Sequence, residues 1–427
     1  MSRRKWKRGE GFDAFSEALG QVSDLSTLQA TVPCSEMSCD RCRSDQEFLR
    51  NAGRLAPPVD RVPVRAVDLF VGCGGMSIGL EEAARRAGRP FEVALAVDLD
   101  EAVLNIYKAN VPKARTRLCD AGSIFNGAIG AARTKAEEEI LSEVGEIDFL
   151  LGGPPCQGHS DLNNHTRRHD PRNVSYLLMA RAAEVLCPKV VIIENVPPVL
   201  WDTSGVVAKT TEALSHAGYK IAGAVVDLRR VGVPQRRRRY LLIGSRVRRV
   251  CPTDILAQLT SAMRGHPDRT VRWAVHDLLD LESGAVYNTA SRTSVENARR
   301  IQYLFDEDRR DLPNSERPEC HRDGKHSYIS MYGRLSWDDP AQTITTGFGS
   351  MGQGRYVHPE KRRTITPHEA ARLQTFPDWF DFGKNTRRGI LAKAIGNAVP
   401  PLLMVALGDA AIEALSRCEP ITIPIPS

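Results

Sequence analysis

Three side chains lie where short apolar runs of the sequence give way to polar turns, and each could take part in nucleophilic or acid–base chemistry. Cys156 follows Pro154-Pro155 after the run IDFLLGG, and the two prolines restrict the backbone in front of the thiol. Glu194 ends the run KVVIIE, and a carboxyl group in apolar surroundings can hold a proton and hand it over. Arg239 ends the run QRRRR, where an arginine facing a cleft needs a phosphate or a substrate oxygen as partner. The combination predicts a thiolate nucleophile with an acid and a cation beside it.

Each of these side chains also has an interpretation without chemistry. A cysteine after two prolines can be a small apolar residue in a stiff turn. Glu194 can be a buried acid bonded to the backbone. For Arg236 and Arg238 we expect a solvated basic turn. The catalytic interpretation gains weight because several such signals follow strand-like runs in succession.

A glycine-rich turn predicts a cofactor site further upstream. The run Asp68-Leu69-Phe70-Val71-Gly72-Cys73-Gly74-Gly75 passes from a strand into a helix, where glycines let the backbone approach a ligand. Asp98 ends the second expected strand and Cys119-Asp120 ends the third, and the two aspartates could accept hydrogen bonds from ribose hydroxyls and an adenine amino group. Ser77 stands where a dinucleotide fingerprint has its third glycine, which favours a nucleoside ligand without a pyrophosphate. The alternative is a tight turn with two helix-capping aspartates.

Alternating apolar runs and helical patterns predict the fold that positions these residues. Apolar runs at 64–70, 91–98, 147–153, 189–195, 221–228 and 240–244 are separated by helical segments, one of them at 101–109. This pattern is typical of a doubly wound α/β domain with a mostly parallel sheet. We expect an N-terminal extension over 1–61, a catalytic domain over 62–245, a smaller domain over 246–335, a return to the catalytic domain over 336–418 and a tail over 419–427. A capping box at Thr366 and Glu369 predicts a helix start, and a last helix is expected over 401–415.

Taken together and in this order, the motifs resemble those of the DNA cytosine-5 methyltransferase family, over residues 64–415. The resemblance implies a Rossmann-like fold that binds S-adenosylmethionine, with residues 246–335 as the target-recognition domain. The matching segments are Asp68-Leu69-Phe70-x-Gly72-x-Gly74-Gly75, Gly153-Pro154-Pro155-Cys156-Gln157, Glu194-Asn195-Val196, Gln235-x-Arg237-x-Arg239, the run from Arg363 through Thr366, Glu369, Arg372 and Leu373 to Phe376-Pro377, and Gly396-Asn397-Ala398-Val399-Pro400-Pro401.

The resemblance implies a role for each matching residue. Cys156 would attack carbon 6 of a flipped-out cytosine, Glu194 would protonate or bind ring nitrogen 3, Arg239 would hold the base and Arg237 would support the active-site loop. The residues expected to line the cofactor pocket are Asp68, Phe70, Gly72, Gly74, Gly75, Asp98, Asp120, Pro155, Asn397 and Val399. The residues expected on the loop that closes over DNA are Gln157, Ser160, Arg167, Arg168 and Arg172.

The sequence departs from the family pattern at two positions. His159 stands where Phe is usual, and Asp98 where Glu is usual. Neither change removes a catalytic function. The implied partner is double-stranded DNA, methylated by a monomer, with a cognate restriction or antiphage component. A transfer-RNA methyltransferase and a catalytically dead binding protein are the alternatives, and intact Cys156, Glu194 and Arg239 disfavour the second.

Composition limits the remaining possibilities. The formal net charge of +6 over 427 residues fits a polyanionic partner only weakly. We expect a cytoplasmic protein without a membrane segment, because no apolar run is long enough and the basic N-terminus lacks an apolar core behind it. Cys34, Cys39 and Cys42 could bind zinc or an iron–sulfur cluster, with Cys320, His321 or His326 as a further ligand, but free thiols are the favoured interpretation.

Overall fold

A seven-stranded sheet forms the centre of the protein, seen in a computed structural model that describes residues 40–56, 58, 61–155, 174–281, 283–322, 331–383 and 386–417. The strand order is β3-β2-β1-β4-β5-β8-β6. The first five of these strands run parallel, and β8 is antiparallel to both of its neighbours. The predicted doubly wound, mostly parallel sheet is confirmed. The strands are β1 (Val64–Leu69), β2 (Phe91–Asp98), β3 (Thr116–Leu118), β4 (Phe149–Gly152), β5 (Val190–Asn195), β6 (Lys220–Asp227) and β8 (Arg238–Ser245).

The antiparallel edge of the sheet follows from the short connection between β6 and β8. The chain turns through the 3₁₀ helix η3 (Leu228–Val231) and the two-residue strand β7 (Gln235–Arg236), with no crossover helix. Parallel neighbours need a crossover of a dozen or more residues, so a connection this short gives an antiparallel pair. Lys220 pairs with Ser245 and Asp227 with Arg238. The Gln-x-Arg-x-Arg motif therefore runs from β7 into the start of β8.

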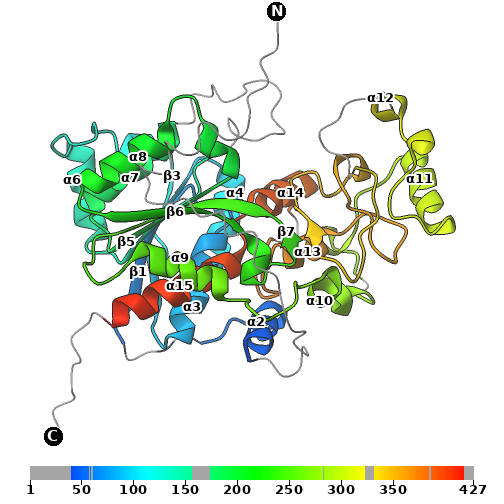
Figure 1. The fold of residues 1–427 in the computed structure, drawn as a ribbon, viewed down its shortest axis with the longest axis horizontal. Coiled ribbons are helices and arrows are strands. Elements are labelled where there is room, and N and C mark those ends of the chain that lie inside the picture. Colours follow the sequence, from blue (N-terminus) through cyan, green and yellow to red (C-terminus); the bar gives the residue numbers. More distant parts are fainter. Residues whose placement is uncertain are drawn as a thin grey trace, which may run out of the picture.

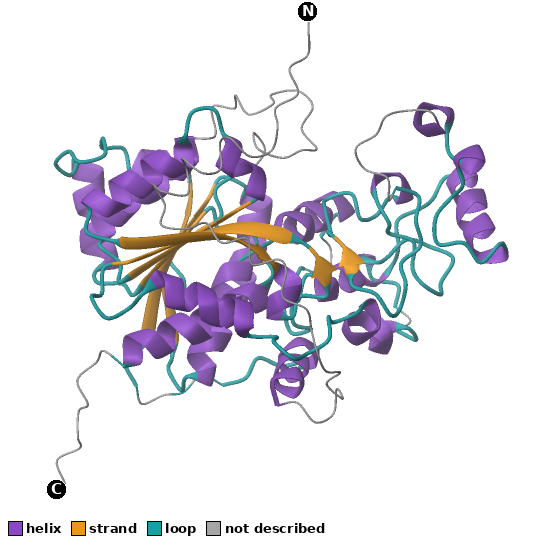
Figure 2. Ribbon diagram, in the orientation of Figure 1, coloured by secondary structure: helices purple, strands orange, loops and turns teal. Residues whose placement is uncertain are grey.

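Helices cover both faces of the sheet (Figures 1 and 2). Alternate strand residues enter two separate apolar cores: Phe149 and Leu151 face α3, α9 and α15, whereas Leu150 faces α5 to α8. Burial on both faces explains why these strands read as continuous apolar runs. The helices are α2 (Asp40–Arg50), α3 (Gly75–Arg86), α4 (Glu101–Asn110), α5 (Ala121–Ile124), α6 (Lys135–Val144), α7 (Val174–Leu186), α8 (Val206–His216), α9 (Pro252–Ser261), α10 (Val271–Val275), α11 (Val295–Asp306), α12 (Glu319–Arg322), α13 (Pro367–Leu373), α14 (Arg388–Asn397) and α15 (Pro401–Ser416).

Two helix starts show why the sequence signals were readable. Thr366 accepts from the backbone of Glu369, whose carboxylate accepts from the backbone of Thr366, so the predicted capping box is present at α13. Pro401 begins α15, as expected, because its missing N–H costs nothing in the first turn. By length and composition alone, Arg388–Ser416 could cross a membrane, but 72% of its apolar window is buried inside the protein.

A smaller lobe lies beyond the sheet, and it has its own apolar cluster. Ile301 and Leu304 of α11 pack there with Leu312, Tyr332, Met351 and Val357. The two-residue strand β9 (Ala341–Gln342) pairs with β7 and brings the chain back to the large domain. Side chains between 250 and 278 belong instead to the large core, including Leu256 and Trp273.

The described part of the N-terminal segment, α2, packs against the large core. Phe48 and Leu49 are 4% and 2% exposed and belong to the same cluster as α3 and α15. The backbone of Asp378 also donates a hydrogen bond to the Leu49 carbonyl. Residues 1–39 lie outside the described residues, and the boundary of the expected extension stays a prediction.

Candidate active site

The glycine turn between β1 and α3 has three residues with left-handed backbone angles. Phe70 has φ 58°, Gly72 φ 55° and Gly74 φ 99°, a conformation that side chains with a Cβ rarely adopt. Gly75 has a different reason to be glycine: a Cβ there would lie 2.0 Å from the Val399 carbonyl oxygen. The turn is thus shaped both by the backbone path and by the close approach of α3 to the C-terminal motif.

The two predicted acidic strand ends differ in their contacts. Asp98 is half-buried at the end of β2, and its carboxylate accepts from the backbone N–H of Gly72 at 2.8 Å and of Asp100 at 2.9 Å. Asp98 therefore links the β2 end to the glycine turn. Asp120 is exposed and caps α5 by accepting from the Gly122 N–H at 2.8 Å. The helix-capping interpretation thus describes the present contact of Asp120 but not those of Asp98.

Two leucines beside these acids were not singled out from the sequence. Leu99 is 69% exposed and Leu118 is 49% exposed, although both are large and apolar. Leu99 directly follows Asp98, and Leu118 is the register partner of Asp98 on β3, so both lie at the ends of these two strands. An apolar residue directly after an acidic strand end was the signal in the sequence that could have identified Leu99.

Asp68 lies beneath the turn rather than at its surface. It is 1% exposed, and Ser77 Oγ donates a hydrogen bond to it at 2.6 Å, with the Tyr107 hydroxyl 3.2 Å from the same Oγ. Burial raises the pKa of Asp68 to about 7, with the charge of Asp98 adding to this and the Ser77 hydrogen bond opposing it. Asp68 therefore braces the turn through Ser77.

The thiol of Cys73, in the middle of the glycine turn, is unsuited to nucleophilic attack. Its sulfur is 3.3 Å from the Ala394 carbonyl, and burial raises the pKa of the thiol to about 12. A thiol with that pKa carries almost no thiolate at neutral pH. The surroundings of Cys73 therefore disfavour it as the nucleophile, and the assignment of this role to Cys156 stays a prediction.

The carboxyl end of β4 brings the remaining motifs together. A Cβ on Gly153 would lie 3.7 Å from Glu194 Oε2 and 3.8 Å from Val399 Cγ2, so three motifs meet at this glycine. Asn195 Nδ2 donates to the Pro154 carbonyl at 3.4 Å, joining the ends of β4 and β5. The half-buried Pro155 is the last described residue before a gap. The predicted positions Cys156, Gln157, Ser160, Arg167, Arg168 and Arg172 lie outside the described residues.

Glu194 and Arg239 form a largely buried ion pair between β5 and β8. Arg239 Nε lies 2.5 Å from Glu194 Oε1, and their side chains are 13% and 9% exposed. Leu241 is the residue directly opposite Glu194, so Arg239 is its diagonal neighbour on the same face of the sheet. Glu194 thus faces a guanidinium as well as the apolar strand, which the sequence pattern alone did not indicate.

The other residues of the Gln-x-Arg-x-Arg motif contact segments near residues 340 and 398. Arg237, 3% exposed, donates to the carbonyls of Ile344 at 3.0 Å and Ala398 at 3.1 Å. Gln235 accepts from the Ile344 N–H at 2.9 Å. Arg236 is exposed and pairs with Asp339 at 3.0 Å. Arg237 therefore meets backbone carbonyls of two segments that lie far from it in the sequence.

The C-terminal motif closes the site from the other side. Asn397 is exposed at the end of α14, and Val399 is half-buried. Gly396 packs so closely that a Cβ would lie 2.3 Å from the Thr346 N–H. Because Val399 also reaches Gly75 and Gly153, the predicted cofactor and nucleophile motifs adjoin in space.

The three cysteines considered as metal ligands in the sequence gain no ligand set among the described residues. Within the described ranges, no group of three or more His, Cys, Asp or Glu side chains could hold a metal ion. Cys42 is buried, with its sulfur 3.9 Å from Arg269 Nη2. Cys34 and Cys39 lie outside the described residues, so the interpretation of these cysteines as free thiols stays a prediction.

This geometry is that of an open, mostly parallel α/β sheet, and proteins of this class bind their ligands at the carboxyl ends of the strands. Residues 64–413 match the C-5 cytosine-specific DNA methylase family, and the chain belongs to that family. It is a DNA (cytosine-5)-methyltransferase.

Similar proteins include bacterial enzymes and distant structural relatives. Type II methyltransferase M1.BsuMI of Bacillus subtilis is 45% identical over 85% of this chain and 84% of its own length. Type II methylase M.HgiDII of Herpetosiphon aurantiacus is 31% identical over 82% of this chain and 94% of its own length. The Dnmt2 structure of S. pombe has a TM-score of 0.57 at 16% identity, covering 82% of this chain and 99% of that one. The structure of the Entamoeba histolytica methyltransferase EhMeth has a TM-score of 0.53 at 16% identity, and the match covers 83% of this chain and 99% of that one. The structural likenesses support the fold.

Proposed function

We propose that the enzyme takes the methyl group from S-adenosylmethionine and transfers it to carbon 5 of a cytosine flipped out of double-stranded DNA, through a covalent bond between Cys156 and carbon 6. The observation that carries this proposal is the meeting of Gly153, Glu194, Arg239 and Val399 at the sheet edge immediately before Cys156. A nucleophile needs fixed approach geometry, and this edge brings a charge pair and the glycine turn to one place.

The ends of β2 and β3, beside the glycine turn, fit a nucleoside with a charged amino-acid part. The carboxylate of Asp98 can accept from ribose hydroxyls, and Asp120 from an adenine amino group. The exposed faces of Leu99 and Leu118 offer the apolar surface that a purine ring needs. Asp98 is one methylene shorter than the usual Glu, and its bond to the Gly72 N–H keeps it close to the turn. Bound S-adenosylmethionine would supply a methyl group activated by a sulfonium.

The remaining predicted cofactor residues come from both sides of the turn. The glycine turn itself would line one side of the cofactor pocket with Phe70, Gly72, Gly74 and Gly75. Asp68 lies beneath this turn and accepts a hydrogen bond from Ser77. Pro155, Asn397 and Val399 would border the methionine part. These assignments follow from their shared position along one edge.

The side chains of this chain would divide the chemistry among them. The Cys156 thiolate bonds to carbon 6, and the electron pair this pushes into the ring makes carbon 5 nucleophilic toward the methyl group. Glu194 holds the proton or hydrogen bond at ring nitrogen 3, and Arg239 fixes Glu194 and contacts the base. As carbon 5 takes the methyl group, the electrons of the broken sulfur–methyl bond would stay on the cofactor's sulfur, which leaves as a thioether. A solvent base then removes the proton from carbon 5, and the electrons of that bond restore the double bond and expel the thiolate. Arg237 supports the site through Ile344 and Ala398.

DNA contacts are assigned to two regions. A loop would close over the flipped base and carry Gln157, Ser160, Arg167, Arg168 and Arg172. His159 on the same loop would alter this closure. The target-recognition role falls to residues 246–335, and within them to the part outside the large core. The separate apolar cluster around Ile301 and Leu304 supports an independent lobe that can vary without disturbing the sheet.

The biological setting follows from the relatives' names. M1.BsuMI and M.HgiDII are named as type II enzymes. We infer that this chain likewise modifies host DNA as part of a restriction or antiphage system, acting in the cytoplasm as a monomer on DNA.

Expression in cells without cytosine methylation tests the proposal. Bisulfite sequencing of their DNA should reveal 5-methylcytosine at one recurring sequence, and a Cys156→Ser strain should show none. Purified enzyme with labelled S-adenosylmethionine should label DNA but not extracted RNA. Label in RNA alone, or methylcytosine without sequence preference, would contradict the proposal.

A further inference from the structure

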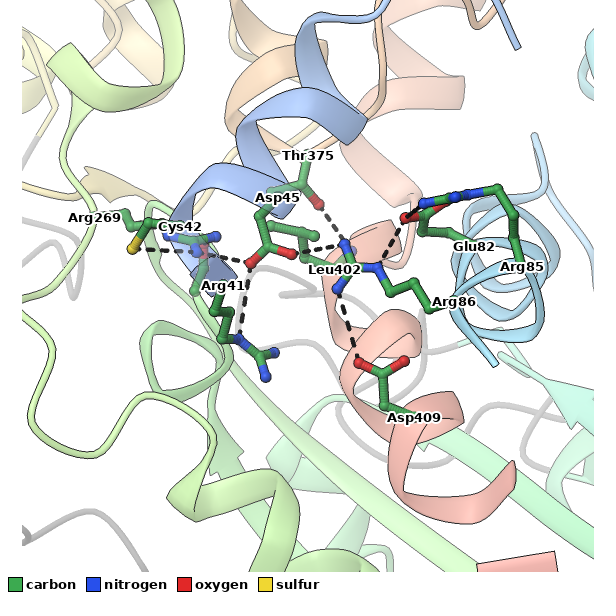
Figure 3. A network of polar contacts seen from close by, with 11 residues as sticks. Arg41, Cys42, Asp45, Glu82, Arg85, Arg86, Arg269, Thr375, Leu402 and Asp409 are labelled. Atoms are coloured by element: carbon green, nitrogen blue, oxygen red, sulfur yellow. Dashed lines mark hydrogen bonds and ion pairs between the residues drawn. The ribbon is translucent and has the colours of Figure 1, made fainter. Parts of the chain in front are cut away.

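Helix α2 lies outside the residues that match the family, yet its acidic residue Asp45 is among the most buried charges of the protein. Asp45 is 0% exposed. Its carboxylate accepts from Arg269 Nη2 at 2.7 Å and from Arg86 Nη2 at 2.9 Å, and Arg41 lies 3.8 Å away (Figure 3). The pKa of Asp45, which burial alone would raise, is lowered by Arg269, Arg86 and Arg41. The residue is an anion held between cations.

One of these cations connects Asp45 to the active-site motif. Arg269 is 4% exposed, its guanidinium stacks over Trp273 at 4.2 Å, and Nη1 donates to the Gly232 carbonyl at 3.1 Å. A Cβ on Gly232 would lie 2.6 Å from the same Nη1. Gly232, at φ 86°, therefore packs directly on the arginine that Asp45 orients.

Gly232 lies in the turn of a loop, residues 228–237, that leads into the Gln-x-Arg-x-Arg motif. The Leu228 N–H donates to the Arg237 carbonyl at 2.8 Å, and the Val233 N–H donates to the Leu228 carbonyl at 3.1 Å. Arg237 lies at the foot of this loop, and Arg239, the partner of Glu194, comes two residues later. A shift of the loop would move these groups.

We propose that Asp45 is a positioning residue for methyl transfer, which fixes the Gly232 turn through Arg269 and thereby the Arg239–Glu194 pair. The inference rests on the proposed roles of Glu194 and Arg239. Arg86 provides a matched control, because it pairs with the same carboxylate but belongs to the end of α3, away from the Gly232 turn. Arg86 also pairs with Glu82 and lies 3.8 Å from Asp409, and Glu82 keeps Arg85 at 2.7 Å when Arg86 is removed.

The test compares Asp45→Asn, Arg269→Lys and Arg86→Gln in the full chain. Methyl transfer to unmethylated plasmid DNA is measured well below each melting temperature, with the folded fraction taken from circular dichroism. Asp45→Asn and Arg269→Lys should lower kcat by about 10-fold or more, toward the ~10²-fold that a small misplacement of catalytic groups can cause. The KM for S-adenosylmethionine should stay unchanged. Arg86→Gln should lower the melting temperature but keep the wild-type kcat.

Every outcome bears on the proposal. Arg269→Lys keeps a cation beside Asp45 but cannot also reach Gly232 with a planar fork, so it decides the question if Asp45→Asn does not fold. A wild-type kcat in the variants that fold would reduce Asp45 to a structural residue. An equal kcat loss in Arg86→Gln would show a general effect and overturn the link to the turn. A wild-type enzyme that transfers no methyl group would instead refute the proposed function.

Discussion

The surroundings of Cys73 argue against it as the nucleophile and leave Cys156 as the proposed one. Cys73 is buried against the Ala394 carbonyl, and its pKa is raised to about 12. Cys156 follows a proline-stiffened turn at the end of β4, where Glu194 and Val399 also arrive. Motif spacing pointed to Cys156, but only the fold shows why Cys73 is unsuitable: α3 and α14 enclose it.

Replacing Cys156 by Ser should abolish methyl transfer while leaving cofactor and DNA binding largely intact, because a hydroxyl at neutral pH is a far poorer nucleophile than a thiolate. Turnover with labelled S-adenosylmethionine and a gel-shift assay measure the two properties separately. The same exchange at Cys73 is the control and should retain turnover. Turnover above a trace in the Cys156→Ser enzyme would place the nucleophile elsewhere.

At the scale of elements, periodicity predicted much of the sheet and little of its edge. The run 91–98 is β2 as expected, because burial on both faces leaves a plain apolar signature. The expected third strand end at Asp120 belongs to a strand that stops at Leu118. The Glu194–Arg239 pair could not be predicted, since it depends on the antiparallel register of β5 and β8. The exposure of Leu99 was not predicted, because apolar residues are normally assigned to a core.

The packing of α3 against the C-terminal motif gives a second prediction. Gly75→Ala would place a Cβ 2.0 Å from the Val399 carbonyl oxygen, so we expect a loss of about 1–3 kcal/mol in unfolding free energy. Cofactor affinity should fall with it. Gly389→Ala, with open space around it in α14, is the control and should stabilise by up to about 1 kcal/mol. Chemical denaturation and calorimetric titration measure both; equal stability of the two variants would contradict the packing argument.

Helix α2 gives a third prediction, because the sequence suggested an extension and the structure packs this helix into the core. Phe48→Ala should lower the unfolding free energy by about 3–5 kcal/mol, the usual result for a buried phenylalanine. Glu47→Ala, on the exposed face of the same helix, should change it little. Thermal melts of both variants provide the measurement. An unchanged melting temperature for Phe48→Ala would mean that α2 is dispensable for the fold.

At the scale of the whole molecule, motifs far apart in the sequence meet at one edge of one sheet. The glycine turn near residue 72, the end of β4 and the segment around Val399 touch through Gly75 and Gly153. The smaller lobe extends to one side with its own core, and α2 lies beside α10, where Arg50 donates a hydrogen bond to the Trp273 carbonyl (Figure 1). The arrangement accounts for a transfer reaction in which cofactor, nucleophile and target DNA must converge.

The most direct test of this account is a trapped intermediate. Fluorine at carbon 5 of cytosine cannot leave as a cation, so elimination stops after methyl transfer and the enzyme stays bonded to the DNA. Duplexes with 5-fluorocytosine at the recognised site should give a denaturation-resistant complex only with S-adenosylmethionine, and peptide mapping should place the bond at Cys156. Glu194→Gln should slow its formation by roughly 10²–10⁴-fold, as for a lost general acid. A methylating enzyme that forms no such complex, or a cofactor-independent bond at another cysteine, would contradict the account.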